Sequence, residues 1–126
     1  MLGSNFIIIE RMKDGVFFKF ALHFMGQNGF TQFTKFARQG TEGIDFTAYR
    51  DSVKHIIRVE KSKEVIDLSF IKSIAENKDI FSASHTLIVT PQEFTQEAIK
   101  YSKDNNIILF GRLEIESWLQ EKYGSG

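Results

Sequence analysis

A pair of β-type runs joined by a short turn, within residues 43–61, constrains the fold more than any other feature. The first run covers residues 44–49 and the second covers residues 54–60, with the polar turn Arg50-Asp51-Ser52 between them, as in a β-hairpin. Ile56 and Ile57 are consecutive apolar residues, which is typical of a central strand covered on both faces. Other segments of the chain must therefore cover both faces of the sheet that contains this hairpin.

The segments around the hairpin predict those layers, because helical and extended patterns alternate along the chain. Apolar positions recur at helical spacing, or form short buried runs, in a regular order after the hairpin. We expect strands at residues 6–9, 30–38, 85–90 and 107–110, and helices at residues 15–26, 62–77, 90–105 and 113–123. Strands followed by helical crossovers predict an α/β fold with a mixed central sheet and helices on both faces.

Two of these helices have capping signals that leave open where they begin. Asp14 is the expected N-cap of the helix at residues 15–26. For the helix that ends near residue 105, Thr90 with Pro91 and Glu93 forms one capping pattern, and Thr95 is a second candidate cap. The sequence alone does not choose between these two starts.

The helix expected at residues 15–26 is apolar on two adjacent stripes over residues 16–25. A helix of this kind is covered on both sides. Two arrangements provide the cover: the helix lies in the core of its own domain, or a second copy of the chain packs on it as a homodimer.

Length and composition point to one domain over residues 1–123, with a flexible tail at residues 124–126. The chain has no cysteine, which excludes a disulfide framework and a thiolate site. It has no apolar run of membrane-spanning length and no secretory leader, so we expect a cytoplasmic protein without a membrane partner. The formal net charge is zero, but residues 1–63 carry 10 basic and 6 acidic side chains, and residues 64–126 carry 6 and 10.

Three sequence motifs occur in the same order as in a known protein family. They are Gly29-Phe30, then Gly43-Ile44-Asp45, and then LIVTPQEFTQEAIKYSKDNNIILFGRLEIESWL at residues 87–119. Over about residues 16–121 the chain resembles the catalytic domain of Mrr-type restriction endonucleases, within the PD-(D/E)xK nuclease superfamily. The resemblance implies Mg²⁺-dependent hydrolysis of a phosphodiester bond in double-stranded DNA, with carboxylates holding the hard cation and a lysine beside it.

The resemblance also implies positions for the reacting groups. The first metal-binding carboxylate of the family corresponds to Asp45, and this position matches the family pattern. The second motif, Gln or Glu, any residue, then Lys, falls on Arg58, Val59 and Glu60. The family's helix glutamate falls on Phe18. The chain therefore departs from the family pattern at three of four positions.

Two interpretations of this site remain. In one, Asp45 and Glu60 hold the metal, and a bulge at the end of the second hairpin strand brings Lys61 round from the opposite face to act as the catalytic lysine. In the other, Asp45, Arg58 and Glu60 form a salt-bridged remnant. Lysines and arginines on or beside the site strands are candidate phosphate contacts: Lys35, Arg38, Arg50, Lys54, Arg58, Lys61 and Lys63.

Other kinds of site have less support. The three histidines, His23, His55 and His85, show no metal-ligand spacing, and we expect surface or packed side chains. The chain has no Walker loop and no nucleophile elbow. Three hypotheses follow: a DNA-binding domain with weak or lost cleavage, an active metal-dependent endonuclease, and an interaction module that retains only the fold.

Overall fold

The computed structural model describes residues 2–37 and 42–124. Helices and strands alternate after an initial pair of helices, in the order that the sequence predicts from residue 14 onward. The elements are α1 (Leu2–Arg11), α2 (Asp14–Gln27), β1 (Thr31–Lys35), β2 (Phe46–Arg50), β3 (Val53–Val59), α3 (Leu68–Ala75), the 3-10 helix η1 (Lys78–Phe81), β4 (His85–Val89), α4 (Gln96–Asp104), β5 (Ile107–Phe110) and α5 (Arg112–Tyr123). No helix in the described ranges is both long enough and apolar enough to cross a membrane.

The five strands form one sheet in the order β1-β2-β3-β4-β5. The pairs β1/β2 and β2/β3 are antiparallel, and the pairs β3/β4 and β4/β5 are parallel. Each parallel pair is joined through a helical crossover, as parallel strands require. The expected mixed sheet is confirmed, with β3 as its central strand.

The β2–β3 hairpin closes through a two-residue turn. Arg50 pairs with Val53, and the turn residues Asp51 and Ser52 have φ values of 53° and 66°. Positive φ at both central residues is the arrangement that matches the right-handed twist of hairpin strands. The turn therefore fixes the register that places Asp45 opposite the end of β3.

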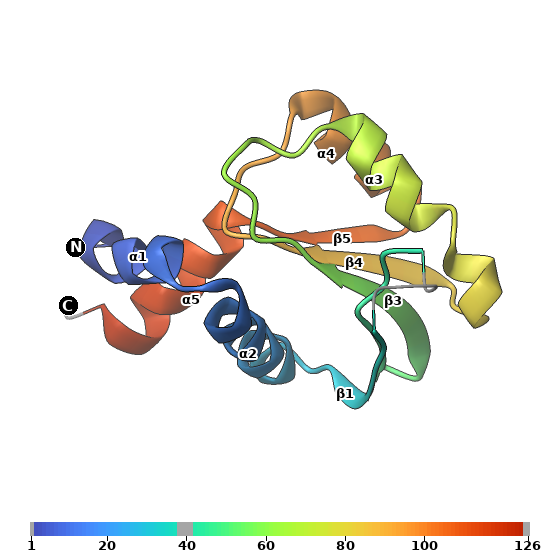
Figure 1. Ribbon diagram of the computed structural model, residues 1–126, viewed down its shortest axis with the longest axis horizontal. Coiled ribbons are helices and arrows are strands. Elements are labelled where there is room, and N and C mark those ends of the chain that lie inside the picture. Colours follow the sequence, from blue (N-terminus) through green and yellow to red (C-terminus); the bar gives the residue numbers. More distant parts are fainter. Residues whose placement is uncertain (1, 38–41, 125–126) are drawn as a thin grey trace.

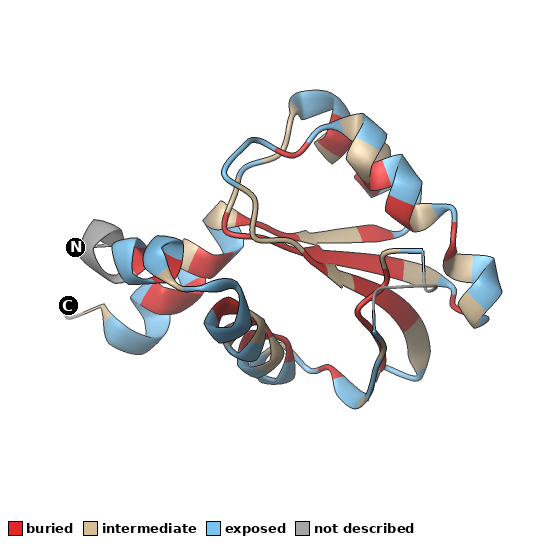
Figure 2. Ribbon diagram, in the orientation of Figure 1, coloured by how far each residue is buried: buried red, intermediate tan, exposed pale blue. Residues whose placement is uncertain are grey.

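Helices cover both faces of the sheet (Figure 1). Helices α3 and α4 lie on one face, and α1, α2 and α5 lie on the other. Neighbouring residues of β3 divide between two apolar clusters: Ile57 belongs to the cluster with α2 and α5, and Ile56 belongs to the cluster with α3 and α4. The central strands are accordingly buried along most of their length (Figure 2). This confirms that the second hairpin strand is covered on both faces.

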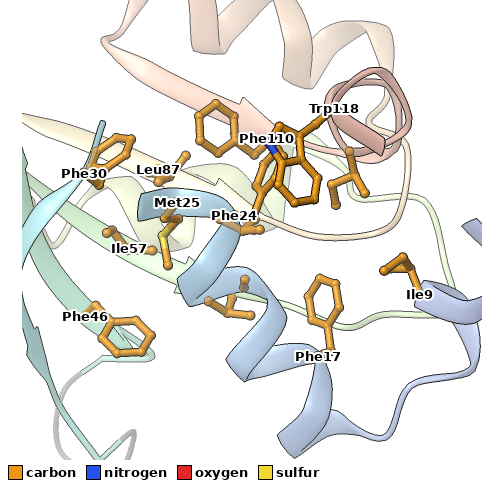
Figure 3. Packing of buried hydrophobic residues seen from close by; sticks show 14 of the residues in the cluster. Ile9, Phe17, Phe24, Met25, Phe30, Phe46, Ile57, Leu87, Phe110 and Trp118 are labelled. Carbon is orange, nitrogen blue, oxygen red and sulfur yellow. The ribbon is translucent and has the colours of Figure 1, made fainter. Parts of the chain in front are cut away.

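Helix α2 packs its apolar stripe inside its own chain (Figure 3). Phe17, Phe24 and Met25 are buried and point toward the sheet and toward Trp118 of α5. The rings of Phe24 and Trp118 meet edge to face, with their centroids 5.3 Å apart. Burying aromatic rings of this size stabilises the fold by roughly 2 kcal/mol each. The core arrangement therefore accounts for the apolar character of this helix.

Three sequence predictions about local structure are wrong. Residues 6–9 belong to helix α1 and not to a strand, because Phe6 and Ile9, three residues apart, are both buried on one helical face. Asp14 is the first residue of α2, and its N-cap is Lys13. The predicted helix over residues 62–77 begins only after Asp67, whose side chain caps it by accepting from the Phe70 amide.

The extended stretch before α3 has its own partner. Ile66 forms an isolated parallel bridge with Phe94, so these residues use their backbone groups between segments and not within a helix. The same bridge explains why α4 does not begin near Thr90. Thr95 is its N-cap and accepts from the Ala98 amide at 3.2 Å. The strand predicted at residues 30–38 ends at Lys35, and the predicted contact residue Arg38 lies outside the described residues.

Candidate functional site

Asp45 immediately precedes β2 and is almost fully buried, with 2% of its surface exposed. Its carboxylate Oδ2 accepts a hydrogen bond of 2.8 Å from the amide of Val59 at the end of β3. The Asp45 amide donates to the carbonyl of Ile57, the residue with which Phe46 pairs, so two consecutive residues lie opposite one, as in a β-bulge. The bulge turns the carboxylate toward the α2 side of the sheet, at the end of β3.

Arg58 and Glu60 form an ion pair where β3 ends. Glu60 Oε1 accepts from Arg58 Nε at 3.0 Å and from Nη2 at 2.7 Å. The third contact of the guanidinium is with the backbone, because Nη1 donates to the carbonyl of Gly43 at 2.8 Å. Gly43 has φ +79°, and a Cβ there would lie 2.5 Å from Nη1. The guanidinium thus occupies space that only a glycine in this conformation leaves free.

Lys61 lies on the same side as Asp45. Alternation along β3 accounts for this side, because Ile57 and Val59, four and two residues earlier, also face the α2 cluster. The ammonium group donates to the carbonyl of Glu10 in α1 at 2.9 Å. Asp45, Glu60 and Lys61 all line one cavity of about 770 Å³. The structure therefore brings the three predicted catalytic residues together.

The cavity has further polar lining that sequence reasoning missed. Asp14, the first residue of α2, and Lys19 line it, as does the predicted contact residue Lys35. Asp14 lies four residues before Phe18, the position that matches the family's helix glutamate, and residues four apart share a helix face. An acidic residue one helical turn before the expected position is the signal that could have identified Asp14.

The carboxylates do not assemble a ligand set for a divalent cation. Among residues 2–37 and 42–124, no group of three or more His, Asp or Glu side chains is placed to hold a metal ion. Asp45 is bonded to a backbone amide, and Glu60 is neutralised by a guanidinium. A cation at Glu60 would also lie beside the positive charge of Arg58. The Mg²⁺ site that the resemblance implies does not fit these side chains as they stand.

The predicted phosphate contacts lie in two separate places. Lys35 and Lys61 line the cavity, and Lys63 is exposed just after β3. Arg50 and Lys54 flank the hairpin turn, at the other end of a seven-residue strand of roughly 20 Å. Arg58 is held by the ion pair already described. Only part of the predicted set is therefore placed to contact one ligand together.

Two histidines meet at the hairpin-turn end of the sheet. His55 and His85 are register partners on β3 and β4, with ring centroids 5.1 Å apart. His55 is buried against Phe30 and its Nδ1 lies 2.9 Å from the Val53 carbonyl. Burial lowers the pKa of His55 below its ordinary value of 6.5; the Val53 hydrogen bond opposes this, and the positive potentials of His85 and Arg50 add to it. Sequence spacing gave no sign of this contact.

Comparisons with known proteins agree with this architecture. Residues 9–119 match a family of catalytic domains described as Restriction endonuclease, of the Mrr type. No curated protein matches the chain. Three solved structures share the fold at low sequence identity. The DNA modification-dependent restriction endonuclease AspBHI has a TM-score of 0.67 and 13% identity, over 95% of this chain and 35% of that one.

The other two structures give the same result. MspJI restriction endonuclease, in complex with a 27-mer oligonucleotide, has a TM-score of 0.62 and 12% identity, over 98% of this chain and 32% of that one. A protein of unknown function, AF1548, has a TM-score of 0.61 and 19% identity, over 85% of this chain and 59% of that one. The chain thus spans between about a third and three fifths of these structures.

Proposed function

The chain belongs to the Mrr-type restriction endonuclease family, and we propose that it binds double-stranded DNA and has weak or no phosphodiester cleavage. The observation that carries this proposal is the Arg58–Glu60 ion pair. By the resemblance, Arg58 and Glu60 occupy the sequence positions of the family's metal-side residue and catalytic lysine, and the Arg58 guanidinium lies over the ring of Phe70 in α3. Binding needs only cations and a complementary surface, but cleavage needs a cation site that the ion pair replaces.

The rim of the cavity supports DNA as the ligand. Lys19, Lys35 and Lys61 line the cavity, and Lys63, two residues after Lys61, is exposed. Cationic side chains around one concave surface contact phosphates and give affinity that falls with salt. AspBHI and MspJI, which share the fold, are restriction endonucleases, and the latter is in complex with an oligonucleotide.

An active nuclease is the second candidate. Asp45, Glu60 and Lys61 line the same cavity, which is the arrangement that a carboxylate pair with a lysine would need. For this candidate, Asp45 and Glu60 would hold Mg²⁺, which would polarise the phosphate, and Glu60 would have to be released from its ion pair with Arg58. A homodimer through residues 16–25 stays a prediction. Among the described residues of this segment, Val16 is the one large apolar side chain that is exposed.

Fluorescence anisotropy with a labelled duplex, across a salt series, tests DNA binding. Replacing both Lys35 and Lys61 by Gln should weaken binding several-fold and reduce the slope of log affinity against log salt by about 2, one for each lost phosphate contact. Lys54→Gln is the matched control, because Lys54 lies at the opposite end of β3. Equal slopes for all three proteins, or no binding at low salt, would overturn the proposal.

A further inference from the structure

Strand β5 forms an open edge of the sheet. The Thr86 amide donates to the Asn106 carbonyl, and the Thr90 amide donates to the Phe110 carbonyl. In a parallel ladder, alternate residues of a strand bond to the same neighbour, so the even-numbered residues of β5 face β4. Ile107 and Leu109 therefore direct their N–H and C=O groups away from the sheet.

A groove runs beside this edge. A cavity of about 470 Å³ is lined by β5, α4, the segment before α4 and the first turn of α5, including Ile99, Ile107, Leu109 and Leu113. Natural sheet edges are usually protected by charges, proline or a covering segment. The sequence of β5, Ile-Ile-Leu-Phe, contains no such residue.

The groove also contains one polar atom without a partner. Ser102 is 2% exposed, and within the described part of the chain its hydroxyl has no hydrogen-bond partner. Leu113, at the end of the groove, is 68% exposed. Open backbone groups, an apolar floor and a buried hydroxyl together favour an occupant that combines apolar side chains with a polar extended backbone.

Charges at the two ends of the groove have opposite signs. Lys103, near the C-terminus of α4, lies at the end where β5 begins. Glu93 and Glu114 lie at the end where β5 leads into Gly111, whose amide donates to Glu114 Oε1. In the described residues, none of these three side chains forms an ion pair. The groove is thus basic at one end and acidic at the other.

We propose that the β5 edge pairs with β5 of a second copy of this chain, antiparallel and about a two-fold axis at Ile108. Ile107 of each copy then exchanges both backbone hydrogen bonds with Leu109 of the other. The two-fold axis also sets Lys103 of each copy opposite Glu93 and Glu114 of the other. A self-complementary charge pattern is what an isologous contact requires.

The pairing would join the two sheets into one. Residues directly opposite each other in an antiparallel pair project from the same face, so the α2 faces of both copies lie on one side. The Asp45 cavities, which are on that face, would then open on the same side of the dimer. Because each copy contributes a strand of four residues, the contact is small and its Kd should be micromolar or weaker.

Sedimentation velocity over a concentration series from about 1 to about 500 µM tests the pairing. The wild-type chain should shift from monomer to dimer across this range, whereas Leu109→Pro should stay monomeric. Proline removes an outward N–H and leaves the bonds to β4 intact. A wild-type chain that stays monomeric throughout would overturn the proposal.

Charge exchange tests the orientation and does not depend on how the proline variant folds. Lys103→Glu and Glu93→Lys should each weaken the dimer about tenfold, and an equal mixture of the two should restore it, because only the mixed dimer pairs opposite charges. Lys100→Glu is the matched control: it makes the same charge change on α4 at an exposed residue outside the groove, and should leave the dimer unchanged. A mixture that associates no better than each variant alone would contradict the antiparallel pairing.

Discussion

The two ends of strand β3 both gather ionisable side chains, but they do so in opposite physical settings. At the C-terminal end, Asp45, Glu60 and Lys61 border an open cavity, and each is bonded to another group of the protein. At the N-terminal end, His55 and His85 lie among packed side chains with Phe30. A ligand therefore has a cavity at the first end, whereas at the second end the rings pack against one another.

The two ends also differ in how the protein accommodates their ionisable side chains. Burial of the His55 imidazole disfavours its charged form and so lowers its pKa. The carboxylates at the other end remain satisfied because a backbone amide and a guanidinium bond to them. Clustered ionisable groups indicate function only in combination with accessible space and free ligand atoms. The Asp45 end has the space, but Asp45 Oδ2 and Glu60 Oε1 already accept hydrogen bonds from the protein.

The largest expected effect is at Asp45. Asp45→Ala removes the acceptor of the Val59 amide and should lower the free energy of unfolding by about 2 kcal/mol, because a buried donor is left without a partner. Asp45→Asn keeps an oxygen at this position and should cost less. Urea denaturation of both variants measures the difference. Unchanged stability in Asp45→Ala would show that the hydrogen bond does not hold the start of β2 to the end of β3.

A smaller effect is expected at Arg58. Arg58→Gln loses the ion pair with Glu60 and the bond to the Gly43 carbonyl, and should lower the free energy of unfolding by about 1 kcal/mol. Lys54→Gln, on the same face of the same strand, should change it by less than about 0.5 kcal/mol. If the two variants lose equal stability, then the ion pair does not stabilise the site end of β3.

The smallest effect is a pH dependence at the opposite end. Since the pKa of His55 lies below 6.5 in the folded state, the unfolded chain takes up a proton first as the pH falls. The contribution of His55 to stability is therefore complete above pH 6.5 and declines as the pH drops below it. Thermal unfolding of wild type and His55→Gln between pH 5 and 8 checks this. If the stability of His55→Gln depends on pH as steeply as that of wild type, then other groups cause the pH dependence.

Much of the fold follows from sequence pattern. The mixed sheet, the helical crossovers and the buried central strand were predicted, because runs such as residues 85–90 and 107–110 have strong apolar patterns. Helix α1 was missed because three consecutive isoleucines favour a strand locally. Packing decided otherwise: Phe6 is fully buried as part of a helix.

The sequence predicted where the site lies, but it did not predict the hydrogen bonds and the ion pair that its side chains form. The Gly-Ile-Asp motif placed Asp45, and its resemblance to the family pointed to Glu60 and Lys61. Which atoms bond to which depends on where β3 ends and on the bulge at Asp45, which spacing does not encode. His55 and His85 are 30 residues apart in sequence, and their contact arises only from the register of β3 with β4.

The central claim is that the ion pair at the end of β3 has replaced the metal site of the family. Conversion of supercoiled plasmid to nicked circles, with Mg²⁺ or Mn²⁺, measures this for wild type, Asp45→Asn and Arg58→Gln/Glu60→Lys. We predict that wild type and Asp45→Asn show the same background and that the double variant, which restores the family motif, nicks faster. Metal-dependent nicking by wild type that Asp45→Asn abolishes would contradict the claim.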